Sequence, residues 1–193
     1  MASLHKRAQG ISLLVMDVDG VLTDGGLYYG PDGEVMKRFD VKDGHGLVIL
    51  RHLKIASAIL TARSSKIVET RMRELGVAHI IQGARDKNAG LEQILAAAGV
   101  TREQVAYIGD DINDLPVLTQ VGLSACPADA RPEVREAVHY VCATPGGRGA
   151  VRELVEVILH AQGRWEEALE IHARHPDTAR SADLKAAEAK PTK

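Results

Sequence analysis

Asp17 and Asp19 are the residues of this sequence best placed to do chemistry. They lie in the segment Asp17-Val18-Asp19-Gly20, directly after the apolar run of residues 11–16. A short apolar run that ends in an acidic loop predicts a buried parallel strand, and residues two positions apart at its tip face the same way. Two neighbouring carboxylates repel each other unless a cation or a reaction uses them. We therefore interpret the pair as ligands of a hard cation such as Mg²⁺, or as including a nucleophile that accepts a phosphoryl group.

Further polar residues follow at the ends of later apolar segments. In chain order they are Thr61, Lys87 and the acidic group Asp110, Asp111 and Asp114. In one parallel sheet the carboxyl ends of the strands share an edge, so these side chains are expected to converge there. Phosphoryl transfer needs a nucleophile, an acid–base group, a hydroxyl and a cation for the phosphate oxygens, and carboxylates for Mg²⁺. Each residue alone is an ordinary turn, cap or surface residue, and only the joint order predicts such a site.

The pattern of the segments that must position these residues predicts an α/β fold, with a Rossmann-like parallel sheet flanked by helices. Short apolar segments predicted as strands alternate with amphipathic segments predicted as helices. The predicted strands are residues 11–16, 55–60, 79–81, 105–108, 123–126 and 139–141. The predicted helices follow Asp43, run from Ser64 or Ser65 to Leu75, run from Asp86 to Gly99, and cover residues 115–121 and 151–159.

A β-hairpin at about residues 26–39 is the one predicted interruption, because Gly30-Pro31-Asp32-Gly33 has strong turn chemistry. The spacing between the polar groups leaves no room for a separate cap domain. We expect one domain over residues 8–163. Residues 164–193 form a C-terminal extension that is predicted to be disordered, because its last part has almost no large apolar side chains.

Composition excludes several classes of partner. The chain has 193 residues and a formal net charge of −2, which gives no reason to expect nucleic acid or an anionic membrane as partner. One Phe and one Trp make stacking on bases improbable, and no apolar stretch is long enough to span a bilayer. Without an export signal, Cys126 and Cys142 are interpreted as reduced core residues, and the expected location is the cytoplasm.

The polar groups, taken in order, resemble the motifs of the haloacid dehalogenase-like superfamily of phosphohydrolases. The matching segments are Asp17-Val18-Asp19-Gly20-Val21, Thr61, Lys87 and Gly109-Asp110-Asp111-Ile112-Asn113-Asp114. The resemblance covers about residues 11–162. It implies that Asp17 is a nucleophile that forms an aspartyl-phosphate and that Asp19 is the general acid and base. It implies that Thr61 and Lys87 hold the phosphoryl oxygens.

The same resemblance implies Mg²⁺ as cofactor. Its ligands are then Asp17, the main-chain carbonyl of Asp19, and Asp110. The residues implied in supporting positions are Asp111, Asn113 and Asp114.

Further segments resemble capless members of the superfamily that hydrolyse sugar acid phosphates. These segments are residues 17–25, the hairpin, Asp43-Gly44-His45-Gly46, Leu60-Thr61-Ala62-Arg63 and Gly146-Gly147-Arg148-Gly149. The implied substrate is the phosphate of an eight-carbon sugar acid of lipopolysaccharide synthesis, and Arg63 is the candidate to bind its carboxylate. Arg148, in a Gly-rich segment, is a second candidate to bind the substrate, in its own site or in that of a neighbouring subunit. A nine-carbon sialic-type sugar acid phosphate stays open as the alternative. The resemblance to members with this layout implies a homotetramer in which a neighbouring subunit completes each site. The apolar hairpin would fit such contacts.

Two other kinds of protein share some of these features. A response-regulator receiver also gathers Asp, Thr and Lys around Mg²⁺, but its Lys comes late in the chain, whereas Lys87 precedes the second acidic cluster. The order therefore excludes a receiver. A non-catalytic relative that only binds phosphorylated ligands would be expected to have lost Asp17 or Asp19, and both are present.

Overall fold

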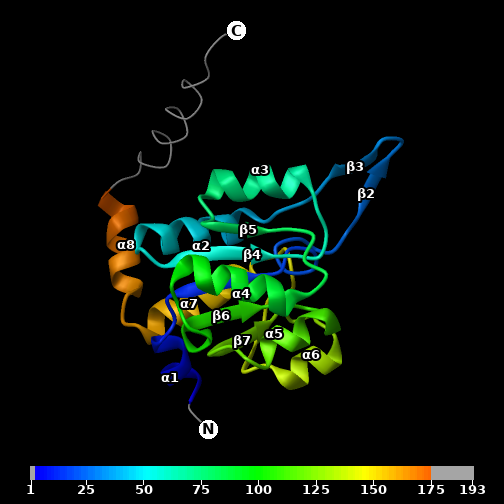
Figure 1. The fold of residues 1–193 in the computed structure, drawn as a ribbon. Coiled ribbons are helices and arrows are strands. Elements are labelled where there is room, and N and C mark those ends of the chain that lie inside the picture. The colour runs from blue at the N-terminus through cyan, green and yellow to red at the C-terminus, as the bar shows by residue number, and fades with distance from the viewer. Residues whose placement is uncertain (1–2, 175–193) are drawn as a thin grey trace.

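The computed structural model describes residues 3–174 and contains a six-stranded parallel sheet between two layers of helices (Figure 1). The strand order is β5-β4-β1-β6-β7-β8, and every pairing in this sheet is parallel. The strands are β1 (Leu13–Met16), β4 (Ala56–Leu60), β5 (His79–Ile81), β6 (Val105–Ile108), β7 (Leu123–Cys126) and β8 (Tyr140–Val141). The predicted α/β fold is confirmed.

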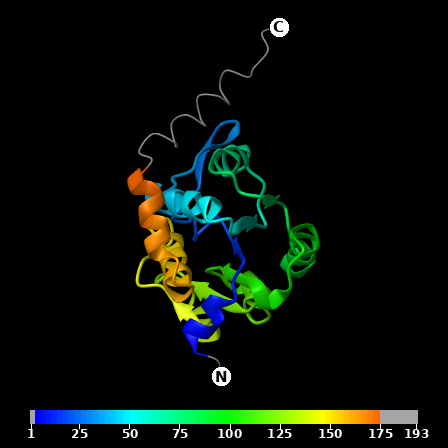
Figure 2. The same cartoon turned by 90° about the vertical axis from the view of Figure 1, so that its left-hand side faces the viewer.

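Helices cover both faces of the sheet. They are α1 (Leu4–Gln9), α2 (Val41–His52), α3 (Lys66–Leu75), α4 (Lys87–Ala98), α5 (Leu115–Leu118), α6 (Pro132–Ala137), α7 (Ala150–Ala161) and α8 (Trp165–Arg174). Short 3₁₀ turns, η1 (Arg102–Gln104) and η2 (Ile112–Asp114), flank β6. Figure 2 separates the layers, with α7 and α8 on one side and α4 on the other.

The central strand β1 explains why two separate cores form. Leu14 and Met16 belong to the cluster that packs under α2 and α7, whereas Leu13 and Val15 belong to the cluster under α4, α5 and α6. Successive side chains of a strand point to opposite faces of the sheet, so a strand covered on both faces must be apolar at every position. All four residues of β1 are fully buried. The acidic loop after β1 therefore begins from a rigid support.

Capping residues fix the ends of the helices that carry polar residues to the edge of the sheet. Asp86 accepts a hydrogen bond from the Ala89 main-chain N–H and starts α4, so Lys87 is the first residue of that helix. Ser65 likewise accepts from the Val68 N–H at the start of α3, and Gly76, with φ 72°, ends α3 in the left-handed conformation. These caps agree with the sequence prediction.

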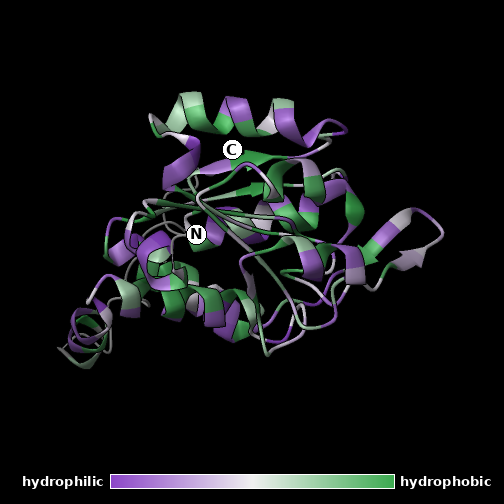
Figure 3. Ribbon diagram, turned by 90° about the horizontal axis from the view of Figure 1, so that it is seen from below, coloured by the Kyte–Doolittle hydropathy of each residue, from purple (hydrophilic) through white to green (hydrophobic). Residues whose placement is uncertain are grey.

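The predicted hairpin is formed by β2 (Tyr28–Gly30) and β3 (Gly33–Met36), which pair antiparallel. It projects from the body of the molecule (Figures 1 and 3). Large apolar side chains on and beside it are exposed: Leu27 50%, Tyr29 60%, Val35 61% and Met36 50%. Between β1 and α2 the hairpin is the only inserted element, so over the described residues the prediction of no separate cap domain agrees with the structure.

The helices show the striped hydropathy of elements that pack on one face, with hydrophilic and hydrophobic residues alternating along their length (Figure 3). None of the helices in residues 3–174 is both long and apolar enough to cross a membrane.

The C-terminal extension corrects one prediction. Residues 164–193 were expected to be disordered, but Trp165–Arg174 form α8. The reason is packing: Ala168 is buried, Trp165 and Ile171 rest against the core beside α7, and the Arg152 guanidinium lies 5.4 Å from the centre of the Trp165 ring. The rest of the predicted extension, residues 175–193, lies outside the described residues. Helices α1 and α6 were also not predicted, since both are short.

Candidate active site

Asp17 sits at the tip of β1, with its carboxylate beside a buried lysine. Its main-chain N–H donates to the Ile108 carbonyl at 3.0 Å, which ties it to β6. The Nζ of Lys87 lies 3.0 Å from its Oδ2, and the Lys87 side chain is only 2% exposed. Burial raises the pKa of Asp17 to about 6, although the Lys87 charge opposes this shift. The pKa of Lys87 is itself raised, because Asp17 and Asp114 outweigh the effect of burial.

Asp114 holds this arrangement together. It is completely buried, and its Oδ1 accepts hydrogen bonds from Lys87 Nζ and, at 2.6 Å, from the Tyr107 hydroxyl. Its Oδ2 accepts from the main-chain N–H groups of Asp110 and Asp111 at 3.0 and 3.2 Å. The same carboxylate therefore aims Lys87 at Asp17 and fixes the loop after β6.

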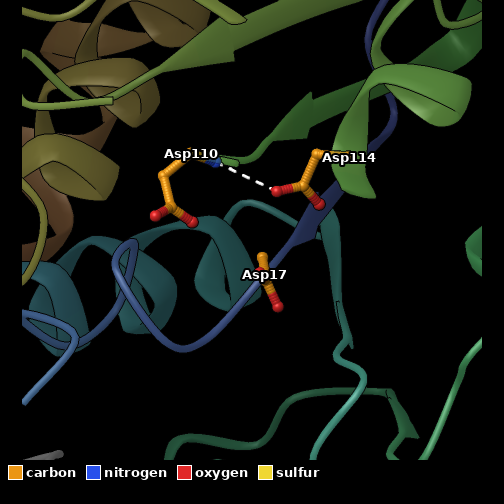
Figure 4. Close-up of side chains that lie close together, drawn as sticks. All are labelled: Asp17, Asp110 and Asp114. Atoms are coloured by element: carbon orange, nitrogen blue, oxygen red, sulfur yellow. Dashed lines mark hydrogen bonds between the residues drawn. The ribbon is translucent and has the colours of Figure 1, made fainter. Parts of the chain in front are cut away.

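Asp17, Asp110 and Asp114 form the one group in the described part of the chain whose spacing suits a metal ion. One carboxylate oxygen of each lies within 4.8 Å of the others (Figure 4). The Oδ1 atoms of Asp17 and Asp110 are buried and have no hydrogen-bond partner among residues 3–174. Both carboxylate oxygens of Asp114, in contrast, accept hydrogen bonds from protein groups. Burial, with the charges of Asp17 and Asp114, raises the pKa of Asp110 to about 7.

These observations fit a hard cation. Oxygen ligands are what Mg²⁺ prefers, and buried carboxylates that repel each other are stabilised by a nearby positive charge. Asp17 and Asp110 offer the free oxygens, and Asp114 supports them from behind. A cation bound at Asp17 and Asp110 would therefore satisfy two atoms that the protein leaves without partners.

Gly20 allows Asp110 to reach this position. The glycine has φ 89°, and a Cβ placed on it would lie 2.1 Å from Oδ2 of Asp110. Any side chain here would displace the Asp110 carboxylate, and the left-handed backbone is also strained for other residues. The turn after β1 and the loop after β6 are thus fitted to each other.

Asp19 points to a different set of partners, two cations. Lys37, which follows β3, makes an ion pair with Oδ1 of Asp19, and the Nε of Arg63 lies 3.5 Å from Oδ2. Arg63 also donates a hydrogen bond of 2.6 Å to the hydroxyl of Tyr29 in the hairpin. Thr61, at the end of β4, is buried, and its N–H donates to the Ile81 carbonyl at 3.0 Å.

Arg148 is exposed, and within residues 3–174 no hydrogen bond or ion pair joins it to the group around Asp17. Its loop nevertheless packs on the turn after β1. Gly146 is so close to that turn that an added Cβ would lie 1.8 Å from the Gly20 carbonyl oxygen, and the Gly147 N–H donates to the Val21 carbonyl at 2.8 Å. Asp43 accepts hydrogen bonds from Gly149 and Arg152 N–H groups and so secures the start of α7.

Comparison with known proteins identifies the family. Residues 50–154 match the haloacid dehalogenase-like hydrolases. The 3-deoxy-D-manno-octulosonate 8-phosphate phosphatase of Yersinia pestis is 48% identical over 163 residues, which are 84% of this chain and 87% of that protein. The chain belongs to the haloacid dehalogenase-like hydrolases. The prediction that it is a phosphatase is confirmed.

Two further relatives of this hydrolase carry the same name. The Escherichia coli (strain B / BL21-DE3) 3-deoxy-D-manno-octulosonate 8-phosphate phosphatase is 44% identical over 167 residues, 86% of this chain and 89% of that protein. The crystal structure of the Moraxella catarrhalis enzyme, a complex with a magnesium ion, a phosphate ion and a KDO molecule, superposes with a TM-score of 0.84 at 39% identity. The match covers 87% of this chain and 97% of the Moraxella catarrhalis chain.

Sequence patterns alone missed Lys37 of this hydrolase and the central place of Asp114. Lys37 lies in a mixed stretch of charged and apolar residues beside a turn, where a lysine is ordinary. The one signal in the sequence was its spacing of three residues from Glu34. In the structure Lys37 Nζ lies 3.1 Å from Oε1 of Glu34. Asp114 was expected only in a supporting position, and the structure makes it the hydrogen-bonding centre of the site.

Proposed function

We propose that this hydrolase removes the phosphate of 3-deoxy-D-manno-octulosonate 8-phosphate in a Mg²⁺-dependent reaction. The observation that carries the proposal is the buried Asp17 carboxylate, which has one oxygen without a partner and lies beside both Lys87 and Asp110. The identity to phosphatases named for this substrate supports the choice of sugar. The reaction belongs to lipopolysaccharide biosynthesis.

In the proposed mechanism Asp17 is the nucleophile. It attacks phosphorus while the bond from phosphorus to the sugar oxygen breaks, and Asp19 gives a proton to that leaving oxygen. Water then attacks the aspartyl-phosphate, Asp19 takes a proton from this water, and the carboxylate of Asp17 is released with phosphate. Two steps of moderate difficulty replace a single hard one.

Other residues of the chain stabilise charge in these steps. Lys87 already lies 3.0 Å from Asp17 and would contact the phosphoryl oxygens together with the Thr61 hydroxyl. Mg²⁺, held by Asp17, the main-chain carbonyl of Asp19 and Asp110, would neutralise the negative charge that gathers on the phosphoryl group. Asp114 keeps Lys87 and the loop of Asp110 in place throughout.

Sugar recognition and assembly complete the proposal. Arg63, next to Asp19, is proposed to bind the sugar carboxylate, since a guanidinium matches carboxylate geometry. Arg148 is proposed to contact the substrate, in its own site or in that of a neighbouring subunit. The exposed apolar residues of the hairpin support a homotetramer whose neighbouring subunits complete the sites. Light scattering in solution tests the tetramer, and a monomer would contradict it. Location in the cytoplasm stays a prediction.

The test is phosphate release with Mg²⁺ from 3-deoxy-D-manno-octulosonate 8-phosphate, compared with a panel that includes a nine-carbon sialic-type sugar acid phosphate. Asp17→Asn is the control. A strong preference for the octulosonate, abolished in this variant, is expected. Equal turnover of many phosphates would contradict the substrate, and no release from any phosphate would favour a protein that only binds phosphorylated ligands.

A further inference from the structure

The carboxylate of Asp19 is held between two cations of very different burial. Lys37 pairs with Oδ1 and Arg63 with Oδ2, and their side chains are 1% and 43% exposed. An exposed ion pair is screened by water and fixes little, whereas breaking an ion pair with a buried ammonium is costly. Lys37 is therefore the residue that sets the orientation of Asp19.

The hairpin supplies both Lys37 and the group that secures it. Glu34, within β3, places its Oε1 3.1 Å from Lys37 Nζ. Its other oxygen, Oε2, accepts a hydrogen bond from the hydroxyl of Ser65, the residue that caps α3. The chain of contacts thus runs from α3 through Ser65, Glu34 and Lys37 to Asp19. The place of Asp19 depends on the place of the hairpin.

We propose that Lys37 is a positioning residue for the proton transfers of Asp19, and that the hairpin acts on catalysis through it. This inference rests on the acid–base role proposed above for Asp19. When the bond from phosphorus to the alcohol oxygen breaks, that oxygen takes the proton of Asp19. When the water oxygen bonds to phosphorus and the bond to Asp17 breaks, the proton of water returns to Asp19. Lys37 donates to Oδ1 and thereby fixes how the carboxylate of Asp19 is turned.

The leaving group of the substrate reports on this role. A strongly basic leaving oxygen needs a proton as its bond to phosphorus breaks, whereas a weakly basic one departs without help. A misplaced Asp19 therefore slows phosphorylation of Asp17 mainly for substrates with basic leaving groups. A lysine that served the fold alone would affect both kinds of substrate equally.

The experiment compares Lys37→Met, which keeps an unbranched side chain but removes the charge, with the wild type. Rapid-quench, single-turnover rates of Asp17 phosphorylation are measured with Mg²⁺ for phenyl phosphate and for p-nitrophenyl phosphate, whose leaving group is the weaker base. We expect the variant to lose at least about tenfold more rate with phenyl phosphate, within the usual size of a general-acid effect. Lys66→Met is the matched control, because Lys66 and Lys37 both line one groove of about 410 Å³, but Lys66 is exposed. Its ratio of rates should equal that of the wild type.

A ratio of the two phosphorylation rates equal to that of the wild type, whether both rates fall or neither does, would overturn the inference. If Lys37→Met does not fold, Glu34→Gln replaces it, since this variant keeps Lys37 and removes the charge that secures it; a smaller selective loss is expected, and an unselective one overturns the inference. A wild type that cleaves both aryl phosphates but not the sugar acid phosphate refutes the proposed substrate and leaves this test valid. A wild type that forms no aspartyl-phosphate refutes the proposed function itself.

Discussion

Replacing Asp114 by Asn tests whether this residue holds the site together. An amide has one oxygen and one NH₂ group where the carboxylate has two oxygens. All four of its hydrogen bonds come from donors: Lys87 and Tyr107 on one oxygen, and the N–H groups of Asp110 and Asp111 on the other. Whichever way the amide turns, its NH₂ group faces two donors, and two hydrogen bonds are lost.

The size of the effect follows from these contacts. Each buried donor left without a partner costs about 1–3 kcal/mol, so two cost about 2–6 kcal/mol. Removing one negative charge also relieves the repulsion that raises the pKa values of Asp17 and Asp110. We therefore expect Asp114→Asn to lower the free energy of unfolding by about 2–4 kcal/mol. For a chain of this length the melting temperature then falls by about 4–16 °C.

Urea denaturation at neutral pH in the presence of a chelator measures this loss as a lower midpoint at an unchanged slope. Asp111→Asn is the matched control, because it is the same change in the same loop at an exposed residue that caps η2. Asn and Asp are nearly equivalent as caps, so the control should change stability by less than about 0.5 kcal/mol. Equal effects of the two substitutions would refute the reasoning.

Three further outcomes are expected. Mg²⁺ should stabilise the wild type against unfolding, by about 2.7 kcal/mol at one hundred times its Kd, and Asp110→Asn should abolish this gain; a melting shift that the variant retains would place the ion elsewhere. Burial raises the pKa of Asp43 to about 6. The folded protein thus binds that proton more tightly than the unfolded chain, and the stability of the wild type relative to Asp43→Asn should fall by up to about 3 kcal/mol as the pH rises from about 4 to 7; a flat difference in urea titrations would contradict this. Gly146→Ala should destabilise the protein and reduce phosphate release, because its Cβ would lie 1.8 Å from the Gly20 carbonyl oxygen. Gly99→Ala, with no atom within 4 Å of its Cβ, should cost only the strain of the left-handed backbone, about 1–2 kcal/mol, and equal melting curves for the two would be the contrary result.

Local patterns predicted most of the fold because the fold repeats one simple unit. Each buried strand is a short apolar run, and α3 and α4 begin and end at caps that are visible in the sequence. The missed helix α8 is stable because Trp165 and Ala168 pack against the core beside α7, where Arg152 lies over the Trp165 ring, and composition alone does not reveal such contacts.

The sequence by itself determined the edge of the sheet at which the site forms. Parallel strands place their carboxyl ends together, so the order of Asp17, Thr61, Lys87 and Asp110 along the chain was enough to predict that they converge. Only the tertiary structure decided how the remaining charges pair. Lys37 reaches Asp19 because the hairpin folds back over 18 residues of chain, and the direction of that return depends on packing rather than on any local pattern. The placement of Asp114 beneath Lys87 depends likewise on how α4 packs against the loop after β6, and a sequence read element by element does not contain that distance.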